Sequence, residues 1–207
     1  MTQITNEHVE WAVVDRLRQM LEEPPHLQFN VTQAYSLFTT ILCWVMQRIR
    51  IPEDEISTPD DEIVRAVLKK LEEASVASDP WQVHPTERVV NVGTTRVRVP
   101  APRGFEGHTA KRLLINLRNT TAHGDARKVT PFNVPIGGAR LLAGFTFTCH
   151  ERDHKWEGEI TLLESDLRRI GGALTTLYCN ALRRSEAHRG DSQFGSNAAR
   201  SVREVAA

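Results

Sequence analysis

The stretch from Arg118 to His123 brings a guanidinium, an amide and an imidazole close together in the chain. A guanidinium binds phosphate or carboxylate groups through a forked set of N–H donors. An imidazole gains and loses a proton near neutral pH, because its ordinary pKa is about 6.5. We therefore take Arg118, Asn119 and His123 as the candidate catalytic residues of this chain.

The spacing of these residues limits how one helix can present them. Asn119 and His123 are four residues apart, so they share a helical face. Arg118 and His123 point about 140° apart around an ideal helix and lie about 7.5 Å apart along its axis. One ideal helix therefore does not aim both side chains at one atom. Either the helix end near Gly124 redirects His123, or two copies of the helix face each other across a twofold axis.

The stretch from Leu114 to Gly124, which contains Arg118, Asn119 and His123, resembles the motif of the HEPN superfamily. That motif is an arginine, usually followed by a polar residue, with a histidine a few residues farther along and close to a helix end. The resemblance implies a small helical bundle that dimerises, with a site formed where two motifs meet. It also implies a metal-independent endoribonuclease without a cofactor, of the kind found in toxin–antitoxin and phage-defence systems.

The same resemblance implies a mechanism and a set of partners. His123 would accept the proton of a ribose 2′-OH, and the resulting alkoxide would attack the adjacent phosphorus. Arg118 would hold the charge that develops on the phosphate, and Asn119 would orient His123 or donate to the phosphate. The partners would be RNA, a second copy of the chain and, for a toxin, an antitoxin protein. Basic residues near the motif would guide the RNA backbone, and they are Lys111, Arg112, Arg127 and Lys128, with His108 beside them.

Two other interpretations of this stretch stay open. A HEPN-like module can bind RNA or a nucleotide, or form a dimer, without cleaving anything. Alternatively, Arg118 and His123 only cap and solvate a helix end, where basic side chains suit the helix dipole. The chain would then be a structural helical protein.

A second group of residues with possible chemistry is Cys149, His150 and His154, because a thiolate and two imidazoles can bind zinc. This group lacks an evident fourth ligand. Cys149 also fits better as an inward-facing strand residue after Phe145 and Phe147. We therefore predict no metal and no cofactor.

Charge and motif content exclude several classes of protein. The chain has 26 basic and 26 acidic residues, so it lacks the excess of positive charge that non-specific nucleic-acid coating requires. Six Lys or Arg residues gather between Arg103 and Lys128, which favours a local contact. The sequence has no Walker loop, GxGxxG, GxSxG or HExxH pattern, which disfavours nucleotide hydrolases, Rossmann dehydrogenases, α/β-hydrolases and common zinc proteases.

Cysteine usage and hydropathy indicate a compartment. Three cysteines without a CxxC pair favour a reducing environment. The first ten residues lack the apolar centre of a signal peptide, and the longest apolar stretch, Leu37 to Ile49, is too short and too polar to span a bilayer. We expect a soluble, cytoplasmic protein without a membrane partner.

Apolar spacing predicts five helices and two β-hairpins. The helices occupy about 6–21, 30–51, a stretch from Thr58 through Leu71, 109–123, and a stretch from Ser165 through Ala181. The hairpins lie near 88–99 and 142–163. The pair Gly171-Gly172 marks either a weak point of the last helix or a place where another helix comes close. The expected fold class is mainly α, a HEPN-like helical bundle of about five helices with two small β-hairpin insertions. It would span residues 1–184, followed by a mobile C-terminal tail over 185–207.

Overall fold

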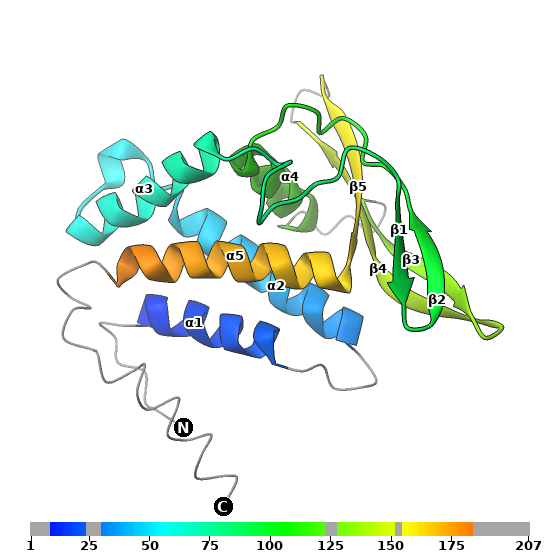
Figure 1. Ribbon diagram of the computed structural model, residues 1–207. Coiled ribbons are helices and arrows are strands. Elements are labelled where there is room, and N and C mark those ends of the chain that lie inside the picture. The colour runs from blue at the N-terminus through cyan, green and yellow to red at the C-terminus, as the bar shows by residue number, and fades with distance from the viewer. Residues whose placement is uncertain (1–8, 24–29, 123–127, 152–154, 184–207) are drawn as a thin grey trace, which may run out of the picture.

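The computed structural model describes residues 9–23, 30–122, 128–151 and 155–183. Figure 1 shows the helices gathered on one side and the strands on the other, with α5 leading from the end of β5 in among the helices. The helices are α1 (Val9–Glu22), α2 (Asn30–Arg48), the short 3-10 helix η1 (Glu53–Glu55), α3 (Pro59–Glu73), α4 (Ala110–Ala122) and α5 (Glu164–Leu182). The strands are β1 (Arg88–Val92), β2 (Thr95–Val99), β3 (Val129–Ile136), β4 (Ala139–His150) and β5 (Glu157–Leu163).

The fold mixes helices and sheets, so the prediction of a mainly α bundle is wrong. Of the residues that the structure describes, about half are helical and about a quarter lie in strands. The strands form two antiparallel sheets, β1-β2 and β3-β4-β5. The three-stranded sheet is an integral part of the fold, because its inward side chains belong to the same core as the helices. These side chains are Phe147, Cys149, Ile160 and Leu162.

The third strand of that sheet, β3, is the element that the sequence pattern did not predict. It contains Pro131 and Pro135, which cannot donate to a strand ladder and therefore argue against a strand. β3 lies at the edge of the sheet and pairs with β4 alone, an arrangement that tolerates proline. The register shifts between Phe132 and Asn133, where the edge strand departs from regular pairing.

The two sheets meet through a small apolar cluster. In the β1-β2 hairpin, Val97 and Val99 are buried on the side opposite Arg96 and Arg98. They pack with Val134, Ala143 and Leu163 of the larger sheet. The hairpin predicted over 88–99 is therefore confirmed, and its apolar face is covered by the second sheet.

A local signal explains where α3 begins. Thr58 accepts a hydrogen bond from the backbone N–H of Asp61, and the Asp61 carboxylate accepts one from the backbone N–H of Thr58. This capping box, with Pro59 as the first helical residue, starts α3 at the predicted place.

α2 runs through the core, and its inward side chains are buried, among them Phe38, Ile41 and Leu42.

α4 contacts α2, α3 and β4, so this helix is supported on several sides.

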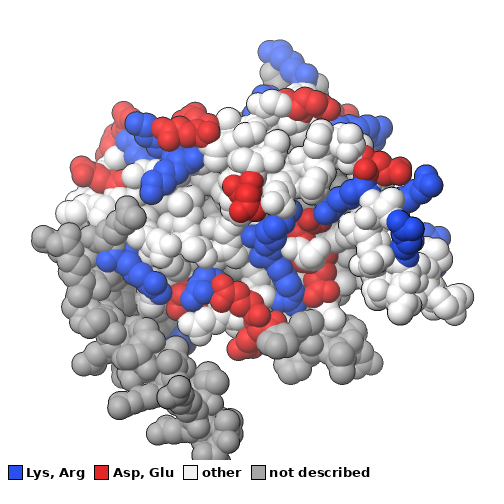
Figure 2. All heavy atoms as spheres, viewed as in Figure 1, with Lys and Arg blue, Asp and Glu red and all other residues white. Residues whose placement is uncertain are grey.

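The predicted end of α4 at His123 and the predicted C-terminal tail fall on residues outside the described part of the chain. Among the described helices, none is both long and apolar enough to cross a membrane. Figure 2 shows acidic and basic side chains interspersed over the face that Figure 1 presents, which agrees with the balanced composition.

Candidate active site on helix α4

The buried face of α4 decides where its polar residues lie. Leu113, Leu114 and Leu117 are fully buried in the core. With 3.6 residues per turn, Arg118 and Asn119 are then brought to the margin of the helix, where both side chains are half-buried. The apolar residues that precede the motif therefore fix the direction of its first two residues.

Arg118 is held between α4 and α2 by neutral groups. Its Nη2 donates to Oε1 of Gln47 on α2 at 2.9 Å, and its Nη1 donates to Oδ1 of Asn119 at 3.3 Å. Its Nε is buried and has no hydrogen-bond partner in the described part of the chain. Both partners are amide oxygens, so the positive charge of Arg118 is not balanced by a carboxylate among the described residues.

A hollow of about 400 Å³ lies beside α4, and Asn119 forms part of its wall. This volume falls within the range of about 300–1,000 Å³ that small-molecule sites occupy. The hollow is bounded by α3, by α4 and by the residue that follows β4. It is lined by Glu72, Thr109, Lys111, Arg112, Ile115, Asn116, Asn119 and Glu151. Lys111, Arg112 and Asn119, predicted from the sequence as site residues, are thus brought to one place.

The two cations of this hollow are both paired with carboxylates. Lys111 Nζ lies 2.9 Å from Oε1 of Glu72, and Arg112 Nη2 lies 2.7 Å from Oε1 of Glu151. The Arg112 guanidinium also lies over the ring of Trp156, 5.6 Å from its centroid, in a cation–π contact. The hollow therefore has nearly balanced charge, in contrast to Arg118 beside it.

Of the remaining predicted site residues, Lys128 and His108 do not line this hollow. His123 and Arg127 lie outside the described residues. Lys128 is half-buried, and its backbone carbonyl accepts a hydrogen bond from the Thr148 N–H at 2.8 Å. His108 is only 4% exposed and stacks against Phe105 and Trp156. Burial, followed by the nearby charge of Arg112, lowers the pKa of His108, so this imidazole does not offer a positive charge at the surface.

The zinc interpretation of Cys149 finds no support in the geometry. Cys149 is fully buried in the core, and burial raises the pKa of its thiol to about 11. A metal-binding cysteine must be deprotonated, which this environment opposes. Within the residues that the structure describes, no group of three His, Cys, Asp or Glu side chains is placed to hold a metal ion, and His154 lies outside that part.

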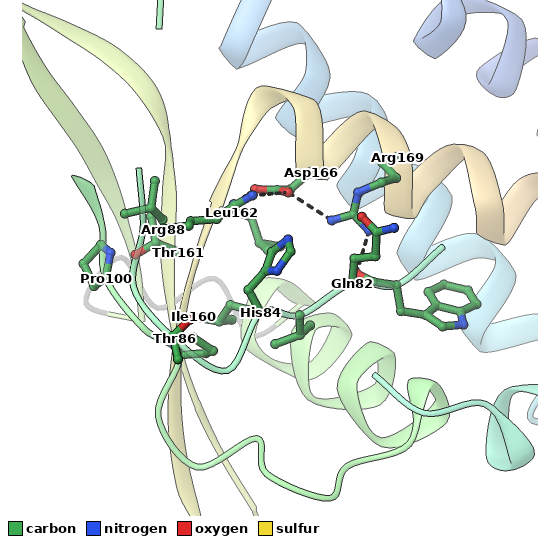
Figure 3. A pocket seen from close by; sticks show the side chains of 14 residues that line it. Gln82, His84, Thr86, Arg88, Pro100, Ile160, Thr161, Leu162, Asp166 and Arg169 are labelled. Atoms are coloured by element: carbon green, nitrogen blue, oxygen red, sulfur yellow. Dashed lines mark hydrogen bonds and ion pairs between the residues drawn. The ribbon is translucent and has the colours of Figure 1, made fainter. Parts of the chain in front are cut away.

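A second pocket lies where the hairpin meets the N-terminus of α5, around Asp166 (Figure 3). Asp166 is paired with both Arg88 and Arg169, and it accepts from the backbone N–H of Leu163 at 3.0 Å. Figure 3 shows the side chains of Arg88 and Arg169 turned toward Asp166. The space left is about 20 Å³, enough for about one water molecule, so we assign this cluster a structural role.

The α4 site also includes four residues that the sequence motif did not predict. Gln47, Glu72 and Glu151 come from other elements, and no local pattern in the sequence ties them to Arg118 or to the hollow. The sequence did offer a cue for Asn116, because it is a polar residue among the apolar positions Leu113, Leu114 and Leu117. The structure buries it with that face, at 4% exposure.

Comparison with family models, with curated proteins and with solved structures finds no match for this chain. The motif and the geometry of α4 are therefore the features that indicate a function.

Proposed function

We propose that this chain is a HEPN-like, metal-independent endoribonuclease, with Arg118 as the phosphate-binding residue and His123 as the general base. Asn119 would orient the phosphate or His123. The proposal is supported by the resemblance of the 114–124 stretch to the HEPN motif and by the environment of Arg118.

The observation that carries the proposal is that Arg118 has no carboxylate partner among the described residues. Burying a cation without an opposite charge is costly, so partly buried arginines are normally paired with carboxylates. Arg48 and Arg88 of this protein follow that rule, through Asp61 and Asp166. Among the described residues, Arg118 is held instead by the amide oxygens of Gln47 and Asn119, which position the guanidinium without neutralising its charge.

The reaction follows from these groups by ordinary transfer chemistry. His123 takes the proton of the 2′-OH, and the 2′-oxygen forms a bond to the adjacent phosphorus while the bond to the 5′-oxygen breaks. The 5′-oxygen takes up a proton from water as it leaves, and the protonated His123 later returns its proton to solvent, so the products are a 2′,3′-cyclic phosphate and a 5′-hydroxyl. Arg118 stabilises the negative charge on the non-bridging oxygens during this step. DNA lacks the 2′-OH and is not cleaved.

The test uses the full chain with a labelled mixed RNA, in the presence of EDTA. Cleavage should persist with the chelator and give cyclic-phosphate ends. Arg118→Gln should lower the rate about 10²- to 10³-fold, because one preorganised donor group is lost from the transition state. His123→Ala should remove cleavage. Arg96→Gln is the matched control, since it removes the same charge from an exposed position on β2.

Cleavage that survives in both site variants would place the activity elsewhere or in a contaminant. RNA binding without cleavage by the unchanged protein would favour the non-catalytic module instead.

The proposal includes a homodimer, because one ideal helix does not aim Arg118 and His123 at the same phosphate. Light scattering during size-exclusion chromatography should give twice the chain mass of 23.4 kDa. A strict monomer that cleaves RNA would show that a single chain completes the site.

A further inference from the structure

One residue in the wall of the hollow beside α4 has a buried polar atom without a partner in the described part of the chain. Asn116 lines the hollow and is 4% exposed, and its Nδ2 has no hydrogen-bond partner among the described residues. A buried amide donor without a partner destabilises the folded state, so native proteins keep such groups rarely and usually for a reason. An acceptor atom of a bound ligand would satisfy this N–H.

The charges in the wall narrow the kind of ligand. Lys111 is paired with Glu72 and Arg112 with Glu151, so the two cations are matched by two anions. A phosphate entering the hollow would meet both carboxylates as well as both cations. A neutral group that carries hydrogen-bond acceptors avoids that repulsion, which favours a flat polar ligand over an anion.

The wall also offers surfaces for stacking. Ile115 contributes apolar surface, and the planar guanidinium of Arg112 is held by Glu151 and by a cation–π contact with Trp156. RNA-binding proteins commonly stack unpaired bases on such apolar and guanidinium surfaces, and read their edges with amide groups. A nucleobase is neutral and flat, and its edge carries acceptors.

Asn119 places this hollow next to the phosphate-binding residue. Its Oδ1 accepts from Arg118 Nη1 at 3.3 Å, while the residue also lines the hollow. A phosphate at Arg118 and a base in the hollow would therefore be neighbours on one RNA strand.

From these contacts we infer that the hollow binds an unstacked nucleobase of single-stranded RNA, with Asn116 donating to an acceptor on the base edge. This inference rests on the proposed function, since it treats the hollow as the base-binding part of the same site. It makes Asn116 a specificity-determining residue that acts on the base and not on the reacting phosphate.

The experiment titrates the full chain with adenosine, guanosine, cytidine and uridine, which carry no phosphate, and follows binding by calorimetry or NMR. At least one nucleoside should bind, with an affinity that changes little between low and high salt, because the ligand is uncharged. Asn116→Leu should weaken that binding about tenfold or more. Asn91→Leu, at an exposed position on β1, should leave it unchanged.

The stability of the free protein separates a binding role from a structural role. Asn116→Leu should raise the melting temperature of the ligand-free protein, because it removes a buried donor that lacks a partner. A structural asparagine would give the opposite result. If the leucine variant does not fold, Asn116→Ala gives the same comparison with a smaller side chain.

Three outcomes would overturn the inference: no nucleoside binds at millimolar concentration, inorganic phosphate displaces the nucleoside from the hollow, or Asn116→Leu leaves the affinity unchanged. The proposed function fails separately. Arg118→Gln should keep nucleoside binding while it loses RNA cleavage. If that variant loses cleavage but the unchanged protein binds no nucleoside, the base site alone is rejected and the proposed function stands.

Discussion

Arg118 donates to Gln47 at 2.9 Å, and this hydrogen bond joins the C-terminal half of α4 to α2 with a neutral partner. The choice of an amide over a carboxylate matters, because glutamine fixes the position of the guanidinium without cancelling its charge. Gln47 is therefore a positioning residue in the proposed nuclease site.

Gln47→Glu changes this partner to a carboxylate of the same shape. The new ion pair should compete with the RNA phosphate for Arg118 and lower kcat/KM for RNA about tenfold, a loss of about 1.4 kcal/mol. Steady-state cleavage kinetics would measure it, with the free energy of unfolding as the check on folding. Gln47→Leu is the comparison, since it removes the hydrogen bond but adds no charge. Equal kcat/KM for the glutamate variant and the unchanged protein would show that the charge of Arg118 is not used.

The ion pairs of Lys111 and Arg112 allow a second test of RNA binding. Glu72→Gln and Glu151→Gln would each free one cation in the hollow. Affinity for single-stranded RNA should rise, and the slope of log K against log salt should steepen by about 0.7 for each new phosphate contact. Fluorescence anisotropy at several salt concentrations would measure both quantities. Glu62→Gln is the control, because it removes the same charge from an exposed position of α3. If all three variants gave the same slope, the two cations would not reach the RNA backbone.

Features with a local cause could be predicted from the sequence. The start of α3 depends on Thr58, Pro59 and Asp61, which are adjacent, and the structure has the helix there. The hairpin over 88–99 has β-branched residues on both sides of Gly93 and alternates valine with arginine in its second strand, and the structure has a hairpin there. In both cases the residues that decide the structure are neighbours in the chain.

Features that depend on distant partners could not be predicted. β3 becomes a strand because β4 offers it an edge, despite Pro131 and Pro135. The same limit applies to the site. Lys111, Arg112 and Arg118 were found because they share one helix. Their side-chain partners on other elements, Glu72, Glu151 and Gln47, are 39 to 71 residues away in sequence.

Asp166 makes the stability of the protein sensitive to acid. Burial would raise the pKa of this carboxyl, but hydrogen bonds from Arg88, Leu163 and Arg169 lower the pKa below its ordinary value. A carboxyl whose pKa is lower in the folded state stabilises the protein fully above its unfolded pKa of about 3.9, and this contribution disappears as the pH falls through the folded pKa. The protein should therefore lose stability below about pH 4.

Asp166→Asn should lower the free energy of unfolding by about 3 kcal/mol at pH 7, because two partly buried guanidinium groups lose their partner. The difference from the unchanged protein should shrink when unfolding by urea is repeated near pH 3. Asp54→Asn, on the exposed helix η1, should have little effect at either pH. A penalty for Asp166→Asn that stays constant with pH would mean that the carboxylate charge is not what stabilises this region.

The two adjacent glycines of α5 should respond in opposite ways to the same substitution. An added Cβ at Gly171 would lie 2.8 Å from Cδ2 of Leu21 and 3.4 Å from Cδ2 of Phe38, so this glycine is where α1 and α2 approach α5. An added Cβ at Gly172 would meet nothing within 4 Å.

Gly171→Ala should therefore destabilise the protein by about 1–3 kcal/mol, because the core must move to admit the methyl group. Gly172→Ala should stabilise it by about 0.5–1 kcal/mol, since alanine favours a helix more than glycine does. Urea unfolding of the two variants measures both changes, and each serves as the control for the other. A stabilising effect at Gly171 would show that Leu21 moves aside at no cost, and that α1 packs more loosely on α5 than the distances indicate.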